Sequence, residues 1–167
     1  MAKKGAPTFD ELVERMAAIH AKLRRRKLTV AAAESCTGGL LATILTTHGG
    51  ASDYFRGGTV VYSDEAKKIL ADVAPQLIHS HGAVSSVVAG ALARGARSRL
   101  SAKIGVGITG IAGPGGAMPG KPVGLTYVAV DSDKHSVVKK YVWTFDRAGN
   151  RLASVGAALD LLEAAIA

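Results

Sequence analysis

Three side chains with a nucleophilic hydroxyl or thiol, Ser35, Cys36 and Thr37, stand together after the apolar run 28–33 and before a helical pattern over 40–47. The first N–H groups of a helix have no partner within the helix, and the helix dipole makes that end positive. Such a junction suits a nucleophile or a bound anion. The structural alternative is that the hydroxyl of Ser35 or Thr37 only caps the helix.

A serine nucleophile needs a neighbouring base. The segment Tyr62-Ser63-Asp64-Glu65-Ala66-Lys67 places a tyrosine at a predicted strand end and a lysine one helical turn later. A lysine becomes a base when burial lowers its pKa, although Lys67 could also face solvent. The spacing of the five histidines indicates neither a triad nor a metal site: His20, His48, His79, His81 and His135.

A second glycine-rich segment, 105–110, matches the pattern G-x-G-x-x-G, with Asp131 about 20 residues further on. A dinucleotide-binding loop needs its last glycine at the start of a helix, whereas here the segment lies in a predicted strand and is followed by Gly113-Pro114-Gly115-Gly116. We therefore reject a dinucleotide site. If the strands 28–33 and 103–109 are parallel, the loop that begins at Thr109 lies at the same sheet edge as Ser35 and is a candidate binding loop.

The composition and charge of the chain restrict the functions that it could have. The chain has 167 residues, of which 48% are hydrophobic, so we expect one domain over residues 1–167 with a sizeable core. It has one cysteine, and residues 1–10 lack the apolar region of a signal peptide, so we expect a cytoplasmic protein that contacts no membrane. The net charge of +8 suits a phosphorylated substrate; nucleic acid is disfavoured, because the densest basic cluster, 24–27, ends a helix and carries no aromatic residues.

Periodicity and turn residues predict the elements that position these residues. Thr8 and Glu11 form a capping-box pattern ahead of apolar residues at helical spacing. Further helices are predicted over 64–70, 85–100 and 151–166, and strands over 28–33, 58–62, 103–109, 123–130 and 136–144. The last two strands form a predicted antiparallel hairpin. This order predicts an α/β protein: a three-layer α/β/α sandwich with a mixed sheet of about five strands.

Six ordered motifs carry a family resemblance. The chain resembles the C-terminal domain family of the CinA competence/damage-inducible proteins, whose stand-alone members include nicotinamide-nucleotide amidases, over roughly residues 10–165. The motifs are Ala33 to Gly39; Gly57 to Ser63 with Lys67; Gly82 to Ser85; Ile108 to Pro114; Lys121 to Gly124; and Phe145 to Arg147 with Arg151. The run Ala117-Met118-Pro119-Gly120 departs from the family pattern, because it is less polar.

The resemblance implies hydrolysis of the carboxamide of nicotinamide mononucleotide to nicotinate mononucleotide and ammonia, without metal or other cofactor. It implies Ser35 as nucleophile, Lys67 and Tyr62 as its partners, and homo-oligomers. It also implies a substrate-binding role for residues near the reacting centre and for two arginines that could bind phosphate: Glu34, Cys36, Thr37, Gly38, Thr109, Gly110, Arg147 and Arg151.

Several alternatives remain at this stage. Cys36 is a rival nucleophile, since a thiol at a helix start has a lowered pKa. The alternative is that Cys36 is a small buried packing residue, and the family's assignment of the serine as nucleophile favours this alternative. Glu34 either orients a polar group or caps the strand end. N–H groups over 36–39 could stabilise an oxyanion. The rival functions are a silent nucleotide-binding module and a nucleic-acid-binding role in competence or DNA damage.

Overall fold

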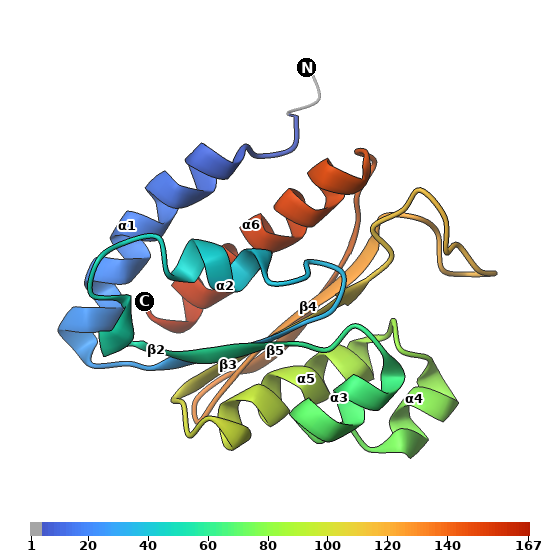
Figure 1. Ribbon diagram of the computed structural model, residues 1–167, viewed down its shortest axis with the longest axis horizontal. Coiled ribbons are helices and arrows are strands. Elements are labelled where there is room, and N and C mark those ends of the chain that lie inside the picture. Colours follow the sequence, from blue (N-terminus) through green and yellow to red (C-terminus); the bar gives the residue numbers. More distant parts are fainter. Residues whose placement is uncertain (1–4) are drawn as a thin grey trace.

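The computed structural model describes residues 5–167. Its centre is one five-stranded sheet in the order β2-β1-β3-β4-β5, covered by helices on both faces (Figure 1). The strands are β1 (Val30–Glu34), β2 (Phe55–Val60), β3 (Ile104–Gly110), β4 (Leu125–Ser132) and β5 (Ser136–Val142). The predicted α/β/α sandwich with a mixed sheet of about five strands is confirmed.

The helices of the described residues form two layers. One layer holds α1 (Phe9–Arg26), α2 (Leu40–Leu45) and α6 (Arg147–Ala165), and the other holds α3 (Asp64–Ala71), α4 (Pro75–His81) and α5 (Ser86–Arg99) (Figure 1). A short 3-10 helix, η1 (Ala51–Asp53), precedes β2. Within residues 5–167, none of these helices combines the length and apolarity that a membrane crossing requires.

The sheet topology brings three strand ends to one edge. β1 pairs in parallel with both β2 and β3, whereas β3, β4 and β5 pair antiparallel. The parallel pairing that would bring Ser35 and Thr109 to one sheet edge is therefore present. In such a sheet, the segments that follow the carboxyl ends of parallel strands meet at one edge, where ligands bind.

Local sequence explains where α1 begins. The Thr8 side chain accepts a hydrogen bond from the Glu11 N–H, and the Glu11 carboxylate accepts one from the Thr8 N–H, so the predicted capping box is present. Four apolar residues at helical spacing then face the core without exposure: Leu12, Met16, Ile19 and Leu23. The prediction that residues 1–10 are no signal peptide lies in part outside the described residues.

The glycines of β3 serve helix packing. A Cβ at Gly105 would overlap the Ala93 carbonyl of α5, and one at Gly107 would overlap the Ala89 carbonyl. Glycine thus lets the α5 backbone lie directly on the sheet. This explains the match to G-x-G-x-x-G without a dinucleotide, because both glycines lie within a strand and no helix follows it at once.

The sequence boundaries were wrong at several elements. β1 and β2 are shifted from the predicted 28–33 and 58–62, and α4 and η1 were not predicted at all. α6 begins four residues before the predicted start, because the Asp146 carboxylate accepts the Gly149 N–H and caps the helix. α3 ends before Pro75, and Pro75 itself begins the short helix α4, in whose first turn its missing N–H costs nothing.

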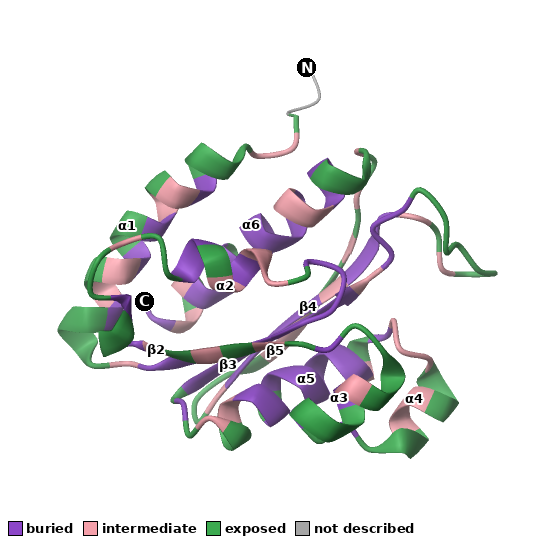
Figure 2. Cartoon of the chain, viewed as in Figure 1, coloured by how far each residue is buried: buried purple, intermediate pink, exposed green. Residues whose placement is uncertain are grey.

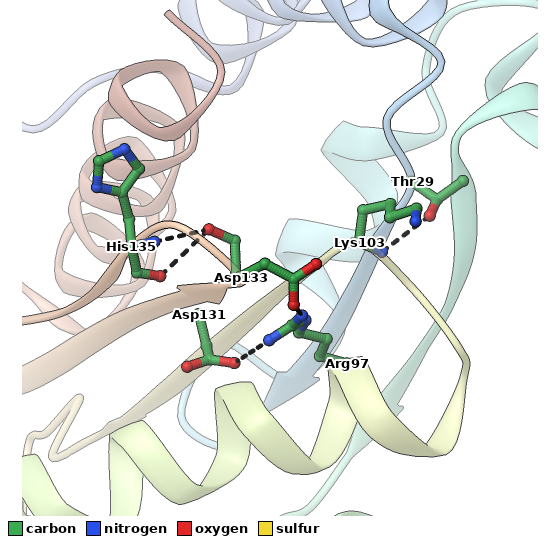
Figure 3. Close-up of polar contacts among 7 residues, drawn as sticks. Thr29, Arg97, Lys103, Asp131, Asp133 and His135 are labelled. Carbon is green, nitrogen blue, oxygen red and sulfur yellow. Dashed lines mark hydrogen bonds and ion pairs between the residues drawn. The ribbon is translucent and has the colours of Figure 1, made fainter.

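At the end of the sheet away from Ser35, charged side chains link α5 to β4. Arg97 of α5 forms ion pairs with Asp131, at 3.0 Å, and with Asp133, beyond the end of β4 (Figure 3). Beside them, the Lys103 N–H donates to the Thr29 hydroxyl at 2.9 Å, which joins the starts of β3 and β1. These contacts anchor α5 and β4 far from the Ser35 edge.

We expect Gly107→Ala to lower the free energy of unfolding by about 1–3 kcal/mol or more, because the added methyl group forces α5 away from β3. Gly115→Ala is the matched control, since a Cβ there meets no atom within 4 Å. Urea unfolding of both variants measures the difference. Equal stability of the two variants would contradict close helix–sheet contact as the reason for the glycine.

Candidate active site

Ser35 begins the turn that joins β1 to α2. Its N–H donates to the Ile108 carbonyl at 3.0 Å, and its own carbonyl accepts the Gly38 N–H at 3.0 Å. Gly38 and Gly39 then take positive φ angles of 59° and 93°, which glycine adopts without strain. Ser35 is buried, with 8% of its surface exposed, and is held between two strand ends.

Lys67 of α3 lies against Ser35. Ser63 caps α3 by accepting the Ala66 N–H, and one turn later Lys67 points inward with 2% of its surface exposed. Its Nζ lies 3.4 Å from Ser35 Oγ and donates to the Val61 carbonyl at 3.0 Å. Of the two alternatives for Lys67, the structure places it at Ser35 and not in solvent.

Burial lowers the pKa of Lys67 below its ordinary value of 10.5, and the Asp64 carboxylate opposes this effect in part. A neutral amine next to a serine hydroxyl can accept its proton. The pair Ser35–Lys67 therefore has both the geometry and the direction of pKa shift that nucleophilic catalysis requires.

Cys36 is a poorer candidate for the nucleophile than Ser35. Its side chain is 5% exposed, and burial raises the pKa of the thiol to about 12. At neutral pH almost none of it is thiolate, the form that attacks. Although a thiol at a helix start often has a lowered pKa, desolvation dominates here, so the packing role fits Cys36.

Tyr62 is bound by an arginine and not by Lys67 in this structure. The Arg147 guanidinium, at the start of α6, donates to the Tyr62 hydroxyl at 2.9 Å and to the Gly113 carbonyl at 2.8 Å. Tyr62 itself is 58% exposed. Arg147 thus joins the end of β2 to the loop after β3, an arrangement that sequence spacing did not indicate.

A cavity of about 280 Å³ opens beside Ser35. We call it the Ser35 cavity; it contains Thr109 and Gly110, as the parallel topology predicted, and none of the five histidines. Thr109 helps to shape it by donating its hydroxyl to the Ala83 carbonyl at 2.8 Å. The lining residues are Ser35, Cys36, Tyr62, Asp64, Lys67, Ala83, Val84, Thr109 to Gly113, Gly115, Gly116 and Arg147.

The loop between β3 and β4 forms one wall of the Ser35 cavity. Its residues 114–120 are exposed, and the loop projects away from the layers, at the right of Figure 2. Gly115 and Gly116 line the cavity, while Lys121 ties the loop to the chain before α5 by donating to the His81 carbonyl at 2.8 Å. The loop is thus anchored at Lys121, near its end, while its tip is exposed to solvent.

A hydroxyl does not cap α2. Gly39 is the N-cap and supplies no side chain; instead, the Glu34 carboxylate accepts N–H groups of this turn and helix. The proposed oxyanion donors over 36–39 are reduced accordingly, because the N–H groups of Gly38 and Gly39 already donate to Ser35 and Glu34. Within residues 5–167, the N–H groups of Cys36 and Thr37 donate to no backbone carbonyl.

A second cavity, of about 540 Å³, adjoins the first, and we call it the Arg151 cavity. The two cavities share Ala112, Gly113 and Arg147. Arg151 lines the second one and donates to the Thr37 carbonyl at 2.8 Å. The Thr37 hydroxyl and the Arg151 Nε are both buried and have no hydrogen-bond partner. Of these two residues, only Arg151 lines the cavity, so its unpartnered Nε is the group that fits a bound acceptor.

The structure thus brings most of the predicted site residues together, including Ser35, Lys67 and Thr109. Sequence reasoning missed Asp64 and Asn150. The Asn150 side chain donates to the Ala112 carbonyl at 3.0 Å and accepts the Phe145 N–H, which joins α6 to the cavity wall. Asn150 lies one residue before the predicted helix 151–166, between Gly149 and Arg151, so no periodic pattern singled it out. Among residues 5–167, no three His, Cys, Asp or Glu side chains are grouped to hold a metal ion.

Comparisons with known proteins show what the chain is similar to. The family model of the CinA C-terminal domain matches residues 13–166. A CinA-like protein of Acidobacterium capsulatum is 51% identical over 140 residues, which are 84% of this chain and 34% of that protein. A putative competence-damage inducible protein of Moorella thermoacetica is 46% identical over 93% of this chain and 37% of its own length. The chain therefore spans about a third of these relatives.

Solved structures match over nearly their whole length. The competence/damage inducible protein CihA of Agrobacterium tumefaciens superposes with a TM-score of 0.90 and 36% identity, over 95% of this chain and 96% of that one. A CinA superfamily protein of Escherichia coli gives a TM-score of 0.87 and 30% identity, over 93% and 89% of the two chains.

We expect Lys67→Met to stabilise the protein at neutral pH, because it removes a buried amine that must be desolvated. The unfolded chain binds more protons between the lowered pKa and 10.5, so wild-type stability rises with pH in that window. The gain from Lys67→Met is therefore full below the lowered pKa and shrinks as the pH approaches 10.5. Denaturant unfolding over a pH series measures this.

Lys68→Met is the matched control, since Lys68 lies on the same helix with its side chain 51% exposed. Its effect on stability should not follow the same pH trend. A difference between wild type and Lys67→Met that stays constant from neutral pH to pH 10.5 would show that the pKa of Lys67 is not lowered.

Proposed function

The chain belongs to the CinA C-terminal domain family, and from that membership and the Ser35–Lys67 pair we propose that it is an amidase acting on nicotinamide mononucleotide. The products are nicotinate mononucleotide and ammonia. The observation that carries the proposal is the buried Lys67 amine, 3.4 Å from the Ser35 hydroxyl, with a lowered pKa. A serine and a lysine so placed suit acyl transfer.

In the first half-reaction, neutral Lys67 takes the proton of Ser35 while Oγ attacks the amide carbon. The carbonyl π electrons move to oxygen, where the N–H groups of Cys36 and Thr37 are available as donors. The tetrahedral intermediate then collapses and expels ammonia, which receives the proton carried by Lys67. An acyl-enzyme on Ser35 remains, and Lys67 is neutral again.

In the second half-reaction, water attacks the acyl carbon and gives its proton to Lys67. The Ser35–carbon bond breaks, and Ser35 recovers its proton from Lys67. The Tyr62 hydroxyl accepts a hydrogen bond from Arg147, so its own hydrogen is free to be donated toward the reacting group. In this assignment Lys67 carries the protons, Tyr62 donates a hydrogen bond to the reacting group, and Arg147 fixes the position of Tyr62.

The Arg151 cavity supplies the mononucleotide specificity. Arg147 and Arg151 are two cations on its wall, and the Arg151 Nε has no hydrogen-bond partner among residues 5–167 of the protein. A phosphate offers several acceptor oxygens and negative charge. With the carboxamide in the Ser35 cavity, we place the phosphate in the Arg151 cavity. The expectations of a cytoplasmic location and of a homo-oligomer belong to the same proposal.

We expect purified protein to release ammonia from nicotinamide mononucleotide without added metal, and Ser35→Ala or Lys67→Met to lose at least about a hundredfold in kcat. Mass spectrometry of the product and an ammonia assay measure this. Cys36→Ala should still turn over the substrate. Full activity of Ser35→Ala would refute the mechanism, and nucleotide binding without any turnover would favour a silent binding module.

We expect Arg151→Gln to raise the KM for nicotinamide mononucleotide by about tenfold to a hundredfold, because it removes a charge-assisted contact to phosphate. The activity toward nicotinamide riboside, which lacks the phosphate, should change little. This comparison separates phosphate binding from any disturbance of the Thr37 turn. Arg94→Gln, at an exposed arginine of α5 outside both cavities, is the control. Equal losses on both substrates would argue against a phosphate contact.

A further inference from the structure

The helix that follows Ser35 has no N-cap side chain to bind its first N–H groups. α2 has six residues, and a helix this short is unstable in isolation. Its N-cap is Gly39, which has no side chain to satisfy the first N–H groups, and no serine or threonine hydroxyl replaces it. Some other group must bind these N–H donors, because they are buried or part-buried, where unpaired donors are costly.

Glu34 is that group. The residue is 2% exposed, at the end of β1 and next to Ser35. Its Oε2 accepts the N–H groups of Gly39 at 3.2 Å and Leu41 at 3.0 Å, and its Oε1 accepts that of Ala42 at 2.8 Å. One carboxylate, at the end of β1, thus binds N–H groups on the other side of the turn, at the start of α2. Hydrogen bonds to a charged acceptor are stronger than neutral ones, which suits a buried position.

The turn that Glu34 spans contains the nucleophile. Between β1 and α2, the backbone of Ser35 is held by the Ile108 carbonyl and by the Gly38 N–H, and the turn closes through two glycines at positive φ. Glycines leave a backbone free to move. Glu34 is the side chain that joins the strand end before Ser35 to the helix after it, so it restricts the direction in which Ser35 Oγ points.

We propose that Glu34 is the positioning residue of the nucleophile: its carboxylate holds the Ser35 turn on α2 so that Oγ faces Lys67. Glu34 does not touch the substrate in this assignment, since both of its oxygens are turned to α2. The proposal rests on the proposed function only in taking Ser35 as the reacting group. It also means that the start of α2 is not open to a substrate anion, because the carboxylate occupies it.

The test compares wild type, Glu34→Gln and Glu34→Ala in two reactions. The first is hydrolysis of nicotinamide mononucleotide. The second is modification by diisopropyl fluorophosphate, in which Ser35 Oγ bonds to phosphorus and fluoride leaves with the serine proton going to solvent; intact mass measures its rate. We expect Glu34→Gln to slow both by about tenfold or more while KM changes less than about twofold, since small misplacement of a nucleophile lowers the rate of the chemical step. Glu34→Ala, which keeps no acceptor, should be slower still.

Tyr54→Phe is the matched control for lost stability. The Tyr54 hydroxyl donates to the Leu45 carbonyl at 2.6 Å, at the other end of α2, and the residue is 1% exposed. Its loss should lower the unfolding midpoint and leave both rates at Ser35 unchanged. All assays are run well below the midpoint of each variant.

The outcomes separate the two proposals. If Glu34→Gln reacts as fast as Tyr54→Phe in both assays, the positioning role is overturned while the amidase stands. If wild type hydrolyses no pyridine nucleotide, yet Glu34→Gln slows modification of Ser35, the proposed substrate is wrong and the positioning role is supported. If wild-type Ser35 reacts in neither assay, both proposals are overturned.

Discussion

The contact between the Lys67 amine and the Ser35 hydroxyl constrains the rest of the structure. A buried amine is costly, and here it is satisfied by the Val61 carbonyl and by Ser35 Oγ. The contact requires that the ends of β1 and β2 lie side by side, so that the turn after one faces the helix after the other. Parallel pairing of these strands is therefore a condition of the site and not only of the fold.

The turn that carries Ser35 is held from several sides. Glu34 binds the start of α2, Ile108 of β3 accepts the Ser35 N–H, and Arg151 of α6 binds the Thr37 carbonyl. Glu34 and Arg151 are more than a hundred positions apart in the chain, yet all three residues bind backbone groups within residues 35–42. Such support from separate rigid elements keeps a glycine-rich turn in one geometry, which the proposed role of Ser35 requires.

The sequence predicted the elements with strong periodicity or a clear cap. The α1 capping box, the start of α5 at Ser85 and the β4–β5 hairpin are confirmed. It failed at the start of α6, where the local cap at Asp146 was not recognised because Gly149 interrupts the apolar pattern; a side chain at Gly149 would meet Phe145. α4 has no buried residue, so it left no periodic signal to detect.

The sequence by itself determined the sandwich class and the choice of Ser35 and Lys67 as a candidate pair, because alternation, caps and motifs are local properties. Only the tertiary structure decided that β1 and β3 are parallel, that burial raises the pKa of the Cys36 thiol, that Tyr62 is bound by Arg147, and that Glu34 caps α2. The pKa of a thiol depends on how completely neighbouring elements bury it, and the direction of a side chain depends on which acceptors the fold brings within reach. Neither quantity is encoded in spacing along the chain.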